Sequence, residues 1–71
     1  MTFTINGQER DFPALGAGAT LDTLIEALAL KSDRIAVEHN GTIVRRPEWS
    51  GTPVASGDKL EIVHFVGGGS R

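Results

Sequence analysis

Three consecutive glycines near the C-terminus, Gly67, Gly68 and Gly69, are the residues of this chain whose type and spacing suggest chemistry. They follow an alternating apolar run that begins at Lys59, and no turn signal separates the two. Glycine loses more backbone freedom on folding than any other residue, so three in succession suit a segment that stays mobile or threads through a narrow space. A chain whose own end is the reactive group needs both properties. Although linkers and cloning remnants are also glycine-rich, the unbroken passage favours a flexible tail, residues 67–71, on a rigid domain, residues 1–66.

The other residue types that support catalysis or metal binding are sparse. There is no cysteine, which removes thiolate nucleophiles, disulfides and cysteine-ligated metals. Two histidines, His39 and His64, are too few for a metal site without carboxylate partners at ligand spacing, and we expect packing or surface roles for them. Asp22 and Glu26 lie one helical turn apart, but nothing nearby suggests acid/base catalysis. The sequence predicts neither a catalytic set nor a metal centre.

Composition narrows the class of protein further. With 71 residues the chain has room for one domain, and its 39% hydrophobic content is enough for a small core. Seven basic against 9 acidic residues give a formal charge of −2, which disfavours nucleic acid as a partner. No apolar run approaches the roughly 18 residues of a spanning helix, and the N-terminus lacks the features of a signal peptide. We therefore expect a cytoplasmic protein that does not associate with membranes.

The first elements that position the tail are a hairpin and a helix. Residues 2–5 alternate polar and apolar, and Asn6-Gly7, the preferred pair for a type I′ turn, leads into a second strand at 8–12. We expect Phe3, Ile5 and Phe12 to face the core, and residues 13–19 to connect the hairpin to a helix.

The helix is predicted from a stripe of apolar residues at helical spacing, with Thr20 as its N-cap. Its end is predicted at Ser32-Asp33, with Lys31 in the last turn. The stripe that should face the sheet consists of Leu21, Leu24, Ile25 and Leu28.

The second half of the chain predicts another hairpin and the tail-bearing strand. Residues 35–39 and 42–45 flank a second Asn-Gly pair, and residues 47–50 suit one helical turn with Trp49 as a lid over the core. Residues 52–54 fit only a brief edge segment, and 59–66 form the last strand. One helix on one face of a mixed sheet is an α+β architecture, and the last strand is its natural centre, between the first and third strands.

Period-two alternation then assigns the two faces of the last strand. Leu60 and Ile62 should pack against the helix, whereas Glu61, Val63 and Phe65 should lie on the open face. Exposed apolar residues on an open sheet commonly mark an interface. We therefore predict Val63, Phe65, Glu61 and Val66 as partner-binding residues, and Glu38 lies where it could frame the same face.

Nearly the whole chain resembles ThiS-type sulfur carriers, which have the ubiquitin-like β-grasp fold. The resemblance implies a mixed four- to five-stranded sheet with one main helix packed on one face. The segments that carry it are Asn6-Gly7, Leu21-Asp22-Thr23-Leu24-Ile25, residues 37–44, Pro47-Glu48-Trp49, Ser56-Gly57-Asp58 and, most specifically, residues 61–69.

The resemblance also implies a function. An E1-like, ThiF-like adenylyltransferase would activate the carboxylate of Gly69 with ATP, and a sulfur source would convert it to a thiocarboxylate. That group would supply sulfur to a ThiG-like thiazole synthase in thiamine biosynthesis. Gly67, Gly68 and Gly69 would thread into the partner, and the carrier would be a protein cosubstrate with no bound cofactor and no enzymatic activity.

One feature departs from the family pattern. Family members end at the double glycine, but here Ser70-Arg71 follows Gly69, and an amide-blocked glycine cannot be adenylated. Peptidase trimming and a cloning remnant both remain open as explanations. Other functions also remain open: a sulfur donor like the small subunit of molybdopterin synthase, a ubiquitin-like modifier of lysines, and a plain interaction module.

Overall fold

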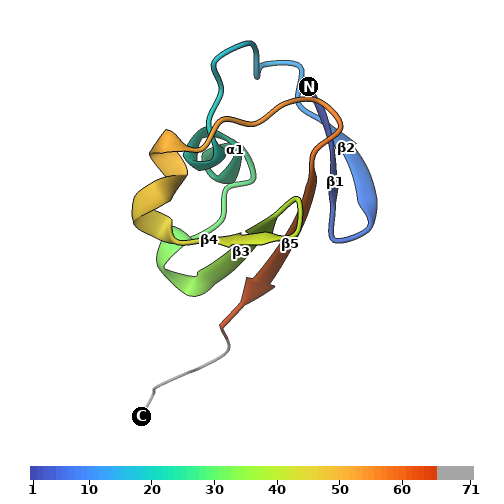
Figure 1. Ribbon diagram of the computed structural model, residues 1–71. Helices are drawn as coiled ribbons and strands as arrows, with labels where there is room; N and C mark the ends of the chain where they lie inside the picture. The colour runs from blue at the N-terminus through green and yellow to red at the C-terminus, as the bar shows by residue number, and fades with distance from the viewer. Residues whose placement is uncertain (66–71) are drawn as a thin grey trace.

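The computed structural model of this chain describes residues 1–65, except for the side chain of Ser32. Five strands form one mixed sheet in the order β2-β1-β5-β3-β4, with α1 on one side of it (Figure 1). β5 is central: it runs parallel to β1 and antiparallel to β3. This is the α+β arrangement that the sequence predicts, with the last strand between the first and the third. The strands are β1 (Thr2–Ile5), β2 (Gln8–Asp11), β3 (Ile35–His39), β4 (Thr42–Val44) and β5 (Lys59–His64).

Both Asn-Gly pairs form the predicted tight turns. Asn6 and Gly7 have φ angles of 51° and 82°, and Asn40 and Gly41 have 50° and 87°. Two consecutive positive φ angles define a type I′ turn, whose twist matches that of the flanking strands. These turns set the register of β1 with β2 and of β3 with β4.

The helix α1 (Leu21–Ala27) is shorter than the sequence predicts. Its apolar stripe is correct, since Leu21, Leu24 and Ile25 are buried and Leu28 packs partly against the core. The predicted end at Ser32-Asp33, with Lys31 in the last turn, is wrong. Ala29 takes a left-handed φ of 59°, which prevents the helix from continuing. The helix ends at Ala27, five residues before the start of a separate 3₁₀ turn, η1 (Ser32–Arg34).

The start of α1 follows Thr20, but the cap differs from the expected one. The Thr20 hydroxyl donates to the Asp22 carboxylate and makes no hydrogen bond to the helix backbone. Asp22 Oδ1 instead accepts from the backbone N–H of Thr23 at 3.0 Å. The acidic residue of the first turn therefore satisfies the backbone donor that the threonine was expected to satisfy.

The core fills the space between α1 and the sheet. Trp49, in the 3₁₀ helix η2 (Arg46–Gly51), is 3% exposed, and its Nε1 donates to the Val44 carbonyl at 2.9 Å. The predicted lid is thus a buried part of the core. The other buried apolar side chains are Phe3, Ile5, Ala19, Leu21, Leu24, Ile25, Ile35, Val37, Val54, Leu60 and Ile62, with Phe12 packed against them.

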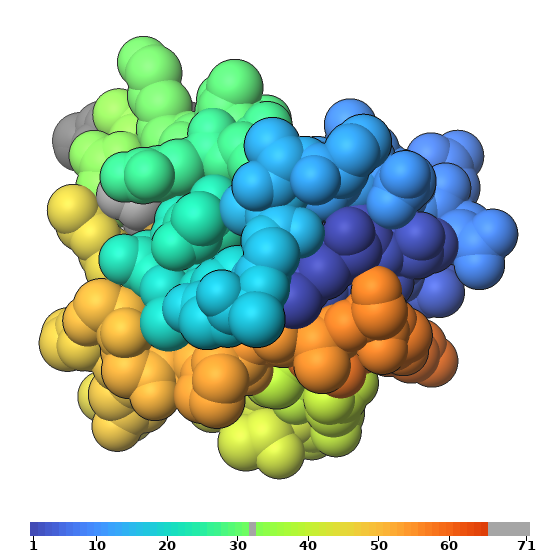
Figure 2. All heavy atoms as spheres, turned by 90° about the horizontal axis from the view of Figure 1, so that it is seen from above, coloured from blue at the N-terminus to red at the C-terminus, as the bar shows by residue number. Residues whose placement is uncertain are grey.

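Two loops close the end of the molecule that holds the N-terminus. Figure 2 shows residues 12–20 lying beside residues 52–58 there. Val54 N–H donates to the Ala19 carbonyl at 3.1 Å, and Leu21 N–H donates to the Thr52 carbonyl at 2.8 Å. The segment 52–54, predicted as a brief edge segment, forms an isolated bridge between Pro53 and Thr20 and no strand, since proline cannot donate to a ladder.

Candidate functional site

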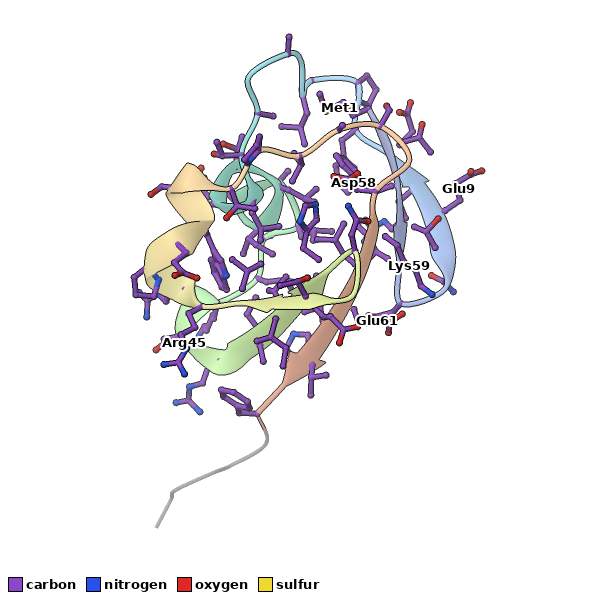
Figure 3. The ribbon with its side chains drawn as sticks, in the orientation of Figure 1. Met1, Glu9, Arg45, Asp58, Lys59 and Glu61 are labelled. Atoms are coloured by element: carbon purple, nitrogen blue, oxygen red, sulfur yellow. The ribbon has the colours of Figure 1, made fainter. Side chains whose placement is uncertain are left out.

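The two faces of β5 differ sharply in exposure, as the alternation predicts. Leu60 and Ile62 are buried toward α1, whereas Val63 is 60% exposed and Phe65 is 56% exposed. Glu61 lies on the same side as Val63, and Figure 3 shows it projecting away from α1. The structure thus places three of the four predicted partner-binding residues on the open face of the sheet, and Val66 lies outside the described residues.

Neighbouring strands add residues to this face. Ala36 of β3 lies opposite Val63, and Glu38 lies between Glu61 of β5 and Ile43 of β4. Ile43 is 72% exposed, the largest value among the exposed large apolar side chains of residues 1–65. Sequence reasoning missed Ile43 as a site residue. The signal was present, since a two-residue turn pairs Glu38 with Ile43, and directly paired residues point to the same face.

We call this surface the docking face, and its apolar residues Ala36, Ile43 and Val63 line a shallow hollow. Its two carboxylates, Glu38 and Glu61, are directly opposite each other and half-buried. Exposed apolar side chains gathered in this way make this surface the candidate interaction site of the described residues. The docking face consists of five residues that line the hollow, Ala36, Glu38, Ile43, Glu61 and Val63, and of the exposed Phe65 just past the end of β5.

The chain leaves the sheet from the end of β5 next to the docking face. Phe65 N–H donates to the Arg34 carbonyl at 2.8 Å, so backbone hydrogen bonding continues one residue past the strand. The last described residue is therefore anchored to the domain and belongs to the docking face itself. The predicted tail residues Gly67, Gly68 and Gly69 lie outside the described residues.

A polar pair supports the turn that precedes β5. His39 Nε2 lies 2.8 Å from Asp58 Oδ2, and that oxygen also accepts from Ala55 N–H at 2.9 Å. Partial burial by itself raises the pKa of Asp58, but hydrogen bonds from His39, Ala55 and Asn40 outweigh it, so this pKa lies below its ordinary value. We expected a packing or surface role for His39, and the structure shows that its side chain joins β3 to this turn through Asp58.

The other polar residues considered in the sequence do not join the docking face. His64 and Glu26 are exposed. Within residues 1–65 there is no group of three or more His, Cys, Asp or Glu side chains able to hold a metal ion. A second hollow lies between α1 and η2, away from the docking face, and is lined by Asp22, Ile25, Glu26, Leu30, Arg46, Pro47, Trp49 and Ser50.

Comparison with known proteins identifies this arrangement. The model of the ThiS family matches residues 3–69, which is nearly the entire chain. The chain belongs to the ThiS family. The match ends at Gly69, so that Ser70 and Arg71 lie beyond it.

Solved structures of the ThiS family show the same fold. The crystal structure of the thiamine biosynthesis protein ThiS from Geobacter metallireducens superposes with a TM-score of 0.82 at 30% sequence identity, covering 97% of this chain and 100% of that one. The solution structure of a thiamine biosynthesis protein from the same organism gives 0.80 at 29% identity, covering 100% and 91%. The predicted ubiquitin-like β-grasp fold is confirmed.

Curated relatives place the same domain in longer chains. A thiazole synthase of Paramagnetospirillum magneticum is 44% identical over 99% of this chain, and one of Magnetococcus marinus is 33% identical over 100%. This chain spans only 21% of either protein. An uncharacterized protein ycf40 of Trieres chinensis, 34% identical, is covered over 89% of its own length. Within residues 1–65, no helix has the length and apolar character needed to cross a membrane.

Proposed function

We propose that this protein is a sulfur carrier for thiazole formation in thiamine biosynthesis, and that its reactive group is the carboxylate of Gly69. The observation that carries the proposal is the ThiS-family match, which extends through the sheet and ends at Gly69. The geometry supports it, because β5 ends beside the exposed docking face and Gly69 follows five residues after His64 in the sequence. The thiamine context is favoured by the thiamine biosynthesis proteins and thiazole synthases that the chain resembles.

The chemistry takes place in the partner's active site. A carboxylate oxygen of Gly69 attacks the α-phosphorus of ATP, and pyrophosphate leaves. Hydrosulfide then attacks the carbonyl carbon of the acyl-adenylate, AMP leaves and a proton is released, so that a C–S bond replaces a C–O bond. Glycine suits this role because no Cβ blocks its passage through a narrow channel or the approach of the nucleophile.

The docking face supplies recognition in this proposal. A ThiF-like adenylating enzyme and later a thiazole synthase would bind the apolar residues Ile43, Val63 and Phe65, while the chain beyond Phe65 enters the active site. Exposed apolar anchors carry most of the energy of such contacts. This division makes the carrier a cosubstrate and leaves catalysis to its partners.

The proposal requires a free carboxylate on Gly69. In the present sequence Ser70 is joined to Gly69 by a peptide bond, which removes that carboxylate. Hydrolysis of this bond must therefore precede adenylation. The full chain and a chain that ends at Gly69 form a matched pair for testing this requirement.

Intact mass spectrometry tests the proposal directly. Both chains are incubated with a ThiF-like enzyme, ATP and sodium sulfide. The chain ending at Gly69 should gain about 16 Da, the exchange of one oxygen for sulfur that follows activation of the carboxylate, whereas the full chain should keep its mass unless a peptidase is added. An unchanged mass for the Gly69-ended chain would overturn the proposal.

Two further readouts separate related functions. A thiazole synthase should consume the thiocarboxylate and return the carrier to its starting mass. Consumption by the large subunit of molybdopterin synthase alone would reassign the carrier to that pathway. Conjugates to lysine side chains would identify a protein modifier instead.

A further inference from the structure

The tip of the first hairpin holds the tail-bearing strand through a side chain. Asn6 Oδ1 accepts from the backbone N–H of Ile62 at 2.7 Å, and Asn6 Nδ2 donates to the Ile62 carbonyl at 3.1 Å. The backbone N–H of Asn6 donates to the Leu60 carbonyl at 2.9 Å. Asn6 therefore contacts two alternate residues of β5, Leu60 and Ile62. Ile62 lies 56 positions after Asn6 in the sequence.

These bonds extend the pairing of β1 with β5. The parallel register runs from Thr4 opposite Lys59 to Ile5 opposite Leu60, and then β1 turns back into the hairpin. The carboxamide of Asn6 supplies the acceptor and the donor that the next strand residue would otherwise present to Ile62. Because a carboxamide has the same polar groups as a peptide unit, the ladder continues two residues closer to the tail.

The turn alone does not explain this choice of residue. A type I′ turn accepts asparagine, aspartate or glycine at its first central position. Glycine has no side chain, and an ionised aspartate accepts hydrogen bonds but cannot donate them. Of these three residues, asparagine is therefore the one that satisfies both backbone groups of Ile62 while keeping the φ of 51° at position 6.

The second hairpin contains a natural counterpart at the other end of β5. Asn40 Oδ1 accepts from Lys59 N–H at 2.8 Å, and Asn40 N–H donates to the Lys59 carbonyl at 2.8 Å. Asn40 has the same turn geometry as Asn6 but clamps the first residue of the strand, far from Phe65. Comparing substitutions at Asn6 and Asn40 therefore separates the effect of losing a turn asparagine from the specific effect of losing the bonds to Ile62 near the tail.

We propose that Asn6 is a positioning residue for delivery of the tail. By holding Ile62, it fixes the orientation of Val63 and Phe65, so that the docking face keeps one geometry up to the point from which the tail is delivered. The link to sulfur loading rests on the function proposed above. The effect of Asn6 on how well ordered the end of β5 is does not rest on that function, and it can be measured in the free protein.

The first test is NMR on the full chain and on the variants Asn6→Gly and Asn40→Gly. Both keep a turn residue that tolerates positive φ. Asn6→Gly should raise the hydrogen-exchange rate of the Ile62 amide about tenfold and lower the order parameters of Val63 and Phe65, whereas Asn40→Gly should leave these residues unchanged. Equal effects of the two variants on Val63 and Phe65, or none from Asn6→Gly, would overturn the proposal.

The second test measures sulfur loading kinetics with chains that end at Gly69. Asn6→Gly should lower kcat about fivefold while KM changes less than twofold, because the face still docks but the end reaches the active site less often. Asn6→Asp should be intermediate, since one of the two bonds remains. Activity that merely follows thermal stability across the variants would contradict a positioning role.

The two tests fail independently. If the unaltered chain is never loaded with sulfur, the proposed function is wrong, and the NMR comparison still decides whether Asn6 orders the end of β5. If loading proceeds but Asn6→Gly and Asn40→Gly have equal kcat, the function stands and the positioning role is wrong.

Discussion

Asp58 shows how one side chain stabilises the approach to the tail-bearing strand. Its carboxylate lies 2.8 Å from His39 Nε2 and accepts from Ala55 N–H, so it ties the turn before β5 to the end of β3. The side chains of His39 and Asp58 are 15% and 17% exposed, and hydrogen bonds to a charged group at this depth contribute more than those at the surface. The depressed pKa of Asp58 has the same origin.

We expect stability to fall in acid through Asp58. Because the pKa of Asp58 is lower in the folded chain than in the unfolded chain, the unfolded chain binds more protons as pH falls. This contribution is complete above the ordinary value of about 4 and disappears as pH drops through the folded value. Urea unfolding between pH 6 and pH 3 measures it.

The variant Asp58→Asn isolates this effect. It should lower the free energy of unfolding at pH 7 by about 1–2 kcal/mol and flatten the loss of stability below about pH 4. Asp33→Asn is the matched control, because Asp33 is an exposed aspartate on η1. If both variants keep the acid slope of the unaltered chain, Asp58 does not link protonation to folding.

At the scale of elements, the end of α1 is the point where local propensity and tertiary structure disagree. The apolar stripe and Lys31 favour a helix that continues past residue 30, yet α1 ends at Ala27. Ala29 adopts the left-handed region that glycine normally occupies after a helix. The reversal lets Leu30 pack partly against the core, where a continuing helix would direct the chain away from β3.

Ala29→Gly should stabilise the protein. Removing the Cβ relieves the strain of φ 59°, a cost of about 1–2 kcal/mol, and the gain exceeds the added entropy of the unfolded chain. We expect Tm to rise by about 4 °C, measured by calorimetry. Ala27→Gly, inside the last turn of the helix, should instead lower Tm, since glycine is disfavoured at helical φ. A fall in Tm for both variants would contradict the assignment of strain to Ala29.

At the scale of the whole molecule, the two faces of the sheet differ in what covers them. α1 and η2 cover one face and build the core, and the docking face remains open on the other side (Figure 1, Figure 3). Its exposed apolar residues, Ile43, Val63 and Phe65, come from β4 and from the end of β5. Substitutions there should therefore affect partner binding without affecting the fold.

Ile43→Asp and Phe65→Asp test this separation. Each should weaken binding of a ThiF-like enzyme at least about tenfold, because a charge replaces an apolar contact at the interface. Each should leave thermal unfolding cooperative, since neither side chain is in the core. Isothermal titration and calorimetry measure the two properties.

Thr42→Asp provides the control for the docking face. Thr42 is exposed on the same short strand as Ile43, but the alternation of β4 places it on the other side of the sheet. Binding should be nearly unchanged. If Phe65→Asp unfolds the domain instead of weakening binding, the assignment of the two faces is wrong.

The sequence by itself determined the features that depend on neighbouring residues. Two Asn-Gly pairs specified type I′ turns, because few residues accept positive φ. Alternation along β5 specified that Leu60 faces inward and Val63 outward, because successive strand residues point to opposite sides. The resemblance of residues 61–69 to the ThiS type identified the family, and Gly69 as its reactive end stays a prediction.

Only the tertiary structure decided which distant residues meet. The bonds of Asn6 to Ile62 and the pairing of His39 with Asp58 depend on strand order and register. The early end of α1 likewise follows from where the core accepts Leu30. Such contacts join segments whose separation in the chain carries no periodic signal, so they arise only when the whole sheet assembles around β5.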